Sequence, residues 1–176
     1  MKKFILGLLC VALPLSASAE WVAGVQYFNL SDDDGGADLS FGGVSASIGY
    51  KFDMGCNCYI IPSFNYGIGL SDEKMSFGEG MDASLELDNM MGFDVRGQWE
   101  FDSGMYVFAA PSYRQLEITA KASIGEFSGS SSAESDWEFG LGAGLGYNFN
   151  ETIGVEAGYE RIDTSDIWSV GMRFNF

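Results

Sequence analysis

Apolar and polar residues alternate along eight stretches of this chain, which is the pattern of a β-strand because successive side chains of a strand point to opposite faces. Each stretch is close to or above the roughly 9–11 residues that a tilted strand needs to cross a membrane. No stretch after residue 19 is apolar for long enough to form a spanning helix. The predicted strands cover residues 21–30, 39–52, 59–70, 87–101, 105–119, 137–149, 153–163 and 167–176.

The chemistry of the two strand faces distinguishes a soluble barrel from a membrane barrel. One face of the second strand carries Val44, Ala46 and Ile48, whereas the other carries Ser45 and Ser47. A soluble barrel cannot fill its core with such a polar face, whereas a membrane barrel turns the apolar face to lipid and the polar face to its lumen. The sequence therefore predicts an all-β fold, an eight-stranded antiparallel up-and-down transmembrane β-barrel.

The fifth predicted strand, residues 105–119, fits this division least well. Its outward face is taken to carry Val107 and Tyr113, with Ala109 and Pro111 between them. This choice places two aromatic residues inside the barrel, Tyr106 and Phe108.

The connections between these strands alternate in length. Residues 102–104 and 150–152 are short turns and residues 53–58 form a slightly longer one, whereas residues 164–165 make a brief connection at the other end. Three long, polar connections also belong to that other end. Short turns on the periplasmic side and long loops outside are typical of bacterial outer-membrane barrels, with both termini in the periplasm. The predicted long loops are residues 31–38, 71–86 and 120–136.

The first 19 residues are typical of an export signal. Two lysines form a basic start, residues 4–15 are apolar, and residues 16–19 have the A-x-A form that signal peptidase accepts. A membrane anchor is the alternative, but the apolar run is shorter than the roughly 20 residues of a spanning helix. We expect cleavage after residue 19, which leaves residues 20–176 as one outer-membrane β-barrel domain.

The charge and the absence of histidine exclude two classes of function. Removing the signal takes away two of the nine basic residues and none of the 25 acidic ones, so the formal charge moves from −16 to −18. Nothing in so acidic a chain would neutralise the phosphates of a nucleic acid. The chain has no histidine, which removes the Ser–His arrangement of a hydrolase. We expect no enzyme activity, no catalytic residues and no cofactor.

Two segments carry a resemblance to a known family. "FGLGAGLGYNFNETIGVEAGYERID", residues 139–163, resembles a strand–turn–strand hairpin of the small outer-membrane barrels of Gram-negative bacteria, namely the OmpA-type membrane domain and the OmpX/opacity, porin-like kind. "WSVGMRFNF", residues 168–176, resembles their C-terminal insertion signal. Unlike full OmpA-like proteins, the chain has no peptidoglycan-binding domain after the barrel. The resemblance implies localisation in the bacterial outer membrane after export to the periplasm.

The insertion signal implies a partner during folding. A terminal strand offers an edge to which another sheet can pair, and the resemblance implies that the barrel-assembly machinery recognises it. The alternative is that Phe176 is only an aromatic residue of the membrane interface, and the two roles are compatible. The residues of the implied signal are Trp168, Val170, Met172, Phe174 and Phe176.

Charged residues on the polar faces are expected to meet in the lumen. An eight-stranded barrel is just wide enough to be filled by side chains, and interior glycines leave room for long arginine and glutamate side chains. These charges form either an ion-pair plug, which we favour, or the lining of a narrow ion path. The predicted lumen network is Lys51, Asp94, Arg96, Glu100, Arg114, Glu138, Glu156, Glu160 and Arg173.

The predicted loops are rich in carboxylates, which are ligands for Ca²⁺ and Mg²⁺. The run "DDDGGAD" lacks EF-hand spacing, so we expect solvated surface charge and no metal site. Loose bridging by divalent cations to lipopolysaccharide phosphates is the intermediate interpretation. The acidic loop residues are Asp32, Asp33, Asp34, Asp38, Asp72, Glu73, Glu79, Asp82, Glu126, Glu134 and Asp136.

Two cysteines remain after removal of the signal, in the sequence "CNC". In the oxidising periplasm Cys56 and Cys58 have the opportunity to close a small disulfide. A redox role and no special role are the other interpretations, and metal binding by two thiols alone is not expected.

These observations predict a structural or surface-interaction protein, acting in envelope integrity or adhesion. The alternative is a narrow porin-like channel for small solutes or ions. The expected partners are outer-membrane lipid and lipopolysaccharide, with or without divalent cations, and the assembly machinery during insertion. We expect a monomer.

Overall fold

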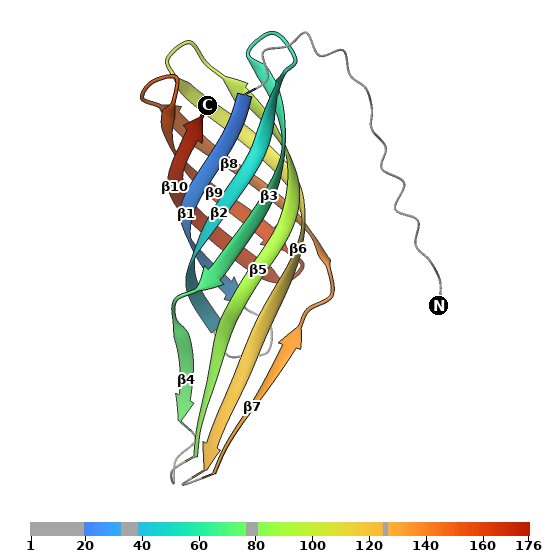
Figure 1. The fold of residues 1–176 in the computed structure, drawn as a ribbon, viewed down its shortest axis with the longest axis vertical. Helices are drawn as coiled ribbons and strands as arrows, with labels where there is room; N and C mark the ends of the chain where they lie inside the picture. The colour runs from blue at the N-terminus through green and yellow to red at the C-terminus, as the bar shows by residue number, and fades with distance from the viewer. Residues whose placement is uncertain (1–19, 33–38, 77–80, 125–126) are drawn as a thin grey trace, which may run out of the picture.

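The computed structural model describes residues 20–32, 39–76, 81–124 and 127–176, and eight of its strands close into an antiparallel barrel (Figure 1). The described segments contain no helix that is long and apolar enough to cross a membrane. The predicted fold is confirmed, with most strand bounds within two residues. The barrel strands, in order around the barrel, are β1 (Glu20–Asp32), β2 (Leu39–Asp53), β3 (Cys58–Gly69), β5 (Met81–Glu100), β6 (Met105–Ile124), β8 (Glu138–Asn148), β9 (Ile153–Ile162) and β10 (Ser165–Asn175).

Pairing between the first and last strands closes the barrel. The register of β1 and β10 runs from Val22 opposite Asn175 to Asp32 opposite Ser165. At the rim, the backbone N–H groups of Trp21 and Phe176 each donate to the other residue's carbonyl, at 2.8 and 2.9 Å. Closure satisfies the backbone groups of both strands, which is a requirement in lipid because no water is present to do so.

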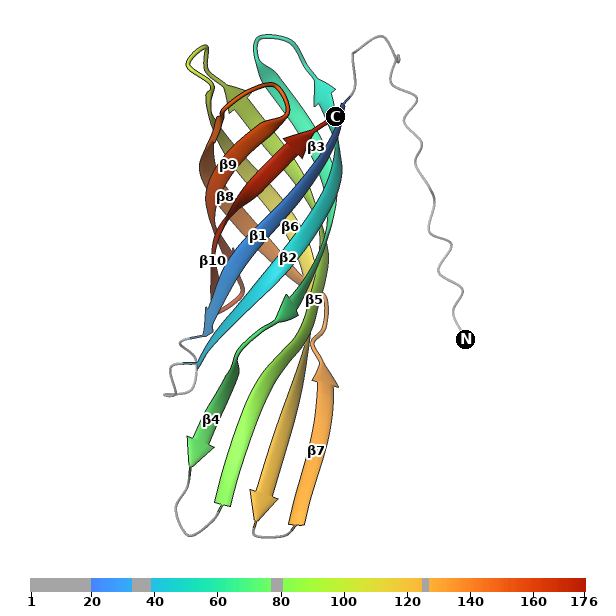
Figure 2. The same cartoon turned by 60° about the vertical axis from the view of Figure 1, so that its left-hand side comes forward.

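The prediction of long loops at residues 71–86 and 120–136, before β5 and after β6, is wrong in part. Two further strands, β4 (Asp72–Ser76) and β7 (Phe127–Glu134), lie within the segments 71–86 and 120–136. β4 pairs with the first part of β5, and β7 pairs with the last part of β6. The result is a four-stranded sheet in the order β4–β5–β6–β7 that projects from the end of the barrel opposite the start of β1 and the end of β10 (Figures 1 and 2). We call it the projecting sheet.

The projecting sheet escaped prediction because it has no lipid-facing side. β5 and β6 are each 20 residues long, which at about 3.3 Å per residue is roughly 66 Å of strand. The apolar band of an outer-membrane barrel is only about 25 Å tall, so both strands continue well beyond it even when tilted. Outside lipid, no selection for alternating hydrophobicity applies, and Ser- and Ala-rich segments such as residues 128–133 continue the ladder through backbone pairing.

The strand faces are divided as the alternation predicts. Outward residues of the barrel strands are exposed and apolar, including Val25, Ile48 and Phe64. In β6, Val107 is exposed and Tyr106 is fully buried. Aromatic side chains gather near the strand ends as touching pairs, as at a membrane interface. These pairs are Trp21–Tyr50, Tyr50–Phe52, Trp99–Phe101, Tyr147–Phe149, Tyr113–Trp137 and Tyr159–Trp168.

Interior glycines of β8 make room for aromatic rings of β6. A Cβ atom added to Gly146 would overlap the ring of Tyr106, and one added to Gly144 would overlap the ring of Phe108. By contrast, Gly97 lies on the outer face, where an added Cβ would meet only the carbonyl oxygen of Ala109 at 3.9 Å. The glycines of β8 therefore admit two aromatic rings as well as the charged side chains expected there.

We predict that Gly146→Ala destabilises the barrel and that Gly97→Ala does not. The buried Tyr106 ring has no free space to enter, and overpacking of this kind costs about 1–3 kcal/mol. The measurement is the free energy of unfolding by urea in lipid vesicles, with the gel-mobility shift of the folded barrel as the readout of the folded fraction. Equal stabilities of the two variants would contradict the close packing of Tyr106 on Gly146.

Candidate functional site

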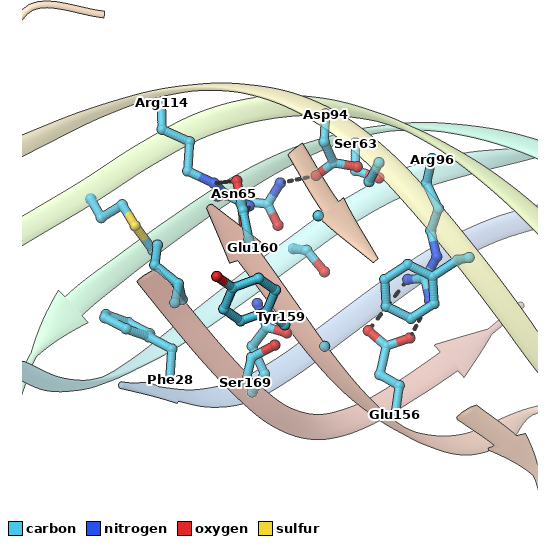
Figure 3. A pocket seen from close by; sticks show the side chains of 18 residues that line it. Phe28, Ser63, Asn65, Asp94, Arg96, Arg114, Glu156, Tyr159, Glu160 and Ser169 are labelled. Carbon is cyan, nitrogen blue, oxygen red and sulfur yellow. Dashed lines mark hydrogen bonds and ion pairs between the residues drawn. The ribbon is translucent and has the colours of Figure 1, made fainter. Parts of the chain in front are cut away.

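The barrel interior holds a small polar cavity of about 80 Å³ (Figure 3). A buried water needs roughly 10–15 Å³ measured in this way, so the cavity has room for only a few water molecules. Residues from β1, β2, β3, β5, β6, β8, β9 and β10 line it, so it lies on the axis of the barrel. The charged residues of its wall are Asp94, Arg96, Arg114, Glu156 and Glu160.

Glu156 on β9 is the centre of the first group of interior charges. Both of its oxygens accept from Arg96, at 2.7 Å from Nη2 and 3.3 Å from Nη1. Arg173 approaches the same carboxylate at 3.6 Å, and the Tyr106 hydroxyl donates to it at 3.2 Å. The Arg96 guanidinium also lies 3.5 Å from the centroid of the Phe108 ring. Such bidentate pairing holds planar groups in one orientation, so this side of the lumen is filled by a fixed arrangement.

Glu160, four residues further along β9, forms a second group toward the projecting sheet. Arg114 donates to its two oxygens from Nε at 2.6 Å and from Nη2 at 2.7 Å, and the Ser112 hydroxyl donates to it as well. Asp94 accepts a hydrogen bond of 2.5 Å from the Asn65 amide. Figure 3 shows Arg114 and Glu160 reaching toward each other, with Asp94 and Asn65 beside them.

A third group lies nearer the short turns and connects to the first through Gln98. Lys51 pairs with Glu100 at 2.8 Å, and Gln98 donates to the same carboxylate at 2.7 Å. The side-chain oxygen Oε1 of Gln98 accepts a hydrogen bond from Arg173 Nη1 at 2.7 Å. Since Arg173 also faces the first group, hydrogen bonds and ion pairs run from Lys51 across the lumen to β9.

Each of the nine residues predicted for the lumen network lies on an inward-facing strand position. Eight of them make the ion pairs and hydrogen bonds just described. The ninth, Glu138, is half-buried and stands directly opposite Arg114 in the β6–β8 register.

An apolar cluster, which the sequence analysis missed, fills the end of the barrel next to the projecting sheet. Its members face inward and are buried, and a bulge between Leu87 and Asn89 turns both Leu87 and Met90 to the inside. The available signal was the occurrence of apolar residues at lumen positions near this end of the barrel, such as Ile162 and Ile167 on either side of the brief connection between β9 and β10. The apolar cluster consists of Phe28, Leu30, Phe41, Leu87, Met90, Leu116, Ile162 and Ile167.

The last strand presents its predicted faces. Arg173 and Asn175 are buried inside, and Phe174 is half-buried on the outer side. The remaining residues of the implied insertion signal are exposed on the outer face, namely Trp168, Val170, Met172 and Phe176. Their recognition by an assembly machinery stays a prediction.

The structure places the two thiols close together and shows no metal site among the described carboxylates. Cys56 and Cys58 are free thiols with their sulfurs 3.2 Å apart, and their disulfide stays a prediction. Within the described part of the chain, no group of three His, Cys, Asp or Glu side chains is placed to hold a metal ion. The acidic residues Asp33, Asp34, Asp38, Glu79 and Glu126 lie outside the described residues.

Comparison with known proteins agrees with this architecture. The sequence matches the model of the outer membrane protein beta-barrel domain over residues 4–176. The chain belongs to this family. It is therefore a bacterial outer-membrane β-barrel protein, as the resemblance predicts. No curated protein matches it in sequence.

Solved structures show the same fold at low sequence identity. Ail, the attachment invasion locus protein of Yersinia pestis, has a TM-score of 0.55 and 17% identity over 90% of this chain and 97% of that chain. A structure of Ail in complex with the heparin analogue sucrose octasulfate gives 0.54 and 18%, with the same coverage. The N-terminal β-barrel domain of Pseudomonas aeruginosa OprF gives 0.45 and 17% over 88% of this chain and 97% of that chain. At such identity the likeness concerns the fold alone.

We predict that Arg114→Ala strongly destabilises the barrel. The substitution leaves Glu160 buried without its cation, and breaking a buried pair in this way costs about 3–5 kcal/mol. Lys121→Ala is the matched control, because it breaks the exposed Lys121–Glu86 pair, for which about 0–1 kcal/mol is expected. Urea unfolding in lipid vesicles gives the free energy of unfolding of both variants. Equal decreases would contradict a larger contribution of the Arg114–Glu160 pair to stability.

Proposed function

We propose that this outer-membrane barrel acts at the cell surface through its projecting sheet, in adhesion or in envelope integrity. The observation that supports this most strongly is the length of β5 and β6, 20 residues each, which extends the sheet far beyond the membrane. A chain that only had to fill a membrane would not need this extension. The proposal also includes insertion by the barrel-assembly machinery through β10, and function as a monomer.

The edges of the projecting sheet suit it to contact with another protein. In the strand order of the described sheet, β4 and β7 are the two end members, and each pairs on one side only. An unpaired strand edge presents backbone N–H and C=O groups to which a further strand can add. The proposed contact is therefore partly a backbone contact, which tolerates variation in the partner's sequence.

The charge at the end of the barrel that carries the projecting sheet, here called the outer end, indicates the kind of partner. Acidic residues outnumber basic ones by four in residues 31–38, by four in 71–86 and by two in 120–136. Such a surface attracts cationic partners and repels polyanions. Although Ail has been crystallised with a heparin analogue, we do not extend that ligand to this chain. Lipopolysaccharide phosphates remain possible partners only through bridging divalent cations.

The alternative of a narrow channel finds less support. The interior cavity of about 80 Å³ is bordered by ion pairs, and the apolar cluster fills the outer end of the lumen. Hydrated ions would have to displace both. We propose that the interior has a structural role and that the protein is not an enzyme, because the sequence has no histidine to act as a base.

We predict that shortening the projecting sheet weakens surface binding and leaves the barrel folded. The variant lacks residues 72–85 and 120–134, with short turns in their place. Wild type in nanodiscs should be retained on polylysine-coated surfaces at low salt, released at high salt and not retained on heparin. The variant should lose a clear part of the polylysine binding, because it removes four of the ten excess acidic residues counted above.

A charge variant controls for the loss of mass. Glu134→Lys and Asp136→Lys replace two exposed carboxylates without shortening the chain. This variant should bind polylysine more weakly than wild type while keeping the gel-mobility shift of a folded barrel. Undiminished polylysine binding by the shortened variant would contradict the proposal, as would heparin binding by the wild type.

A further inference from the structure

The turn between β2 and β3 has an unusual backbone that is held in place by hydrogen bonds. Three successive residues have positive φ angles, 81° at Gly55, 53° at Cys56 and 59° at Asn57. The Met54 N–H donates to the Cys58 carbonyl at 2.9 Å, and the Cys58 N–H donates to the Gly55 carbonyl at 3.0 Å. Non-glycine residues rarely adopt positive φ angles, so this turn fixes its cysteines in an uncommon geometry.

This turn carries three sulfur-containing side chains at the rim of the barrel. The sulfurs of Cys56 and Cys58 lie 3.2 Å apart. Met54 stands opposite Cys58 across the turn, and both residues line the same apolar groove on the outer surface. Cys56 is exposed and so is 58% of Met54, whereas Cys58 is half-buried.

The chemistry of this sulfur group favours a soft metal ion. Thiolate and thioether sulfurs select Cu(I), whereas Ca²⁺ and Mg²⁺ require oxygen ligands. A structural Zn²⁺ site needs four ligands of the Cys, His or carboxylate type. The described residues offer no group of even three such side chains, so a third ligand here has to be the Met54 thioether.

We propose that residues 54–58 form a Cu(I) site, with the thiolates of Cys56 and Cys58 and the thioether of Met54 as ligands. Binding of one Cu(I) displaces one proton from each thiol, and no electron is transferred. Two sulfurs at about 2.3 Å, the distance found in zinc thiolates, from one metal ion with three ligands in a plane are roughly 4.0 Å apart. The present 3.2 Å separation must therefore widen by about 0.8 Å, which rotation of the exposed Cys56 side chain provides.

The site lies at the end of the barrel that carries the termini, away from the projecting sheet (Figure 1). It does not depend on the proposed surface function. A Cu(I) ion bound there would face the periplasm, because both termini of such barrels lie on that side.

The test uses the full mature chain in nanodiscs, reduced and kept without oxygen, and titrated with Cu(I) against a colorimetric Cu(I) chelator. Native mass spectrometry gives the stoichiometry, for which we expect one ion per chain. Cys56→Ser and Cys58→Ser should each abolish binding, and Met54→Leu should weaken it at least tenfold. Met105→Leu is the matched control, because Met105 is 49% exposed and begins the strand after another turn at the same rim.

Three results would overturn the proposal. The first is Cu(I) binding that survives the double substitution Cys56→Ser/Cys58→Ser. The second is equal affinity of the Met54→Leu and Met105→Leu variants, which would reduce the site to two thiols. The third is isolation of the protein with a Cys56–Cys58 disulfide, followed by failure of the reduced protein to bind Cu(I). None of these variants alters the projecting sheet, so their failure is distinguishable from failure of the surface function.

Discussion

The hydrogen bonds between β1 and β10 are the constraint from which the other features follow. Lipid offers no partner for a free backbone group, so a sheet can cross the membrane only when its first and last strands are paired. Closure fixes which side of every strand is inside, and the period of two then sends every second residue to the lumen. The lumen of eight strands is too narrow for bulk water, so charges such as Arg96 and Glu156 must satisfy each other.

Strand number, strand faces and the charged lumen positions could be predicted because lipid imposes a strict alternation on the sequence. The partners could not, because Arg96 and Glu156 are 60 residues apart and meet through the register and tilt of the closed sheet. The inward position of Leu87 in the apolar cluster was missed because the bulge after it shifts the phase of the alternation. β4 and β7 were missed because strands outside the membrane do not need alternating apolar and polar residues. The three-sulfur group was missed because positive φ angles at Cys56 and Asn57 cannot be read from residue spacing.

With the interior filled, the two ends of the barrel are left to meet other molecules. The outer end carries a long acidic sheet with two unpaired edges, which is suited to cationic or strand-adding partners. The inner rim carries the sulfurs of Met54, Cys56 and Cys58, which are suited to a soft metal ion. In the proposed function, the barrel between them is a rigid support, and its ion pairs serve closure and not transport.

Single-channel recording of the purified protein in planar lipid bilayers tests the filled lumen most directly. The account predicts no conductance steps from the folded wild-type barrel at either polarity, because ion pairs and the apolar cluster close the path in series. The variant Leu116→Ser with Met90→Ser, which makes the cluster polar, serves as the matched comparison. Regular, reproducible conductance steps from the wild type would contradict the account and would favour the narrow channel.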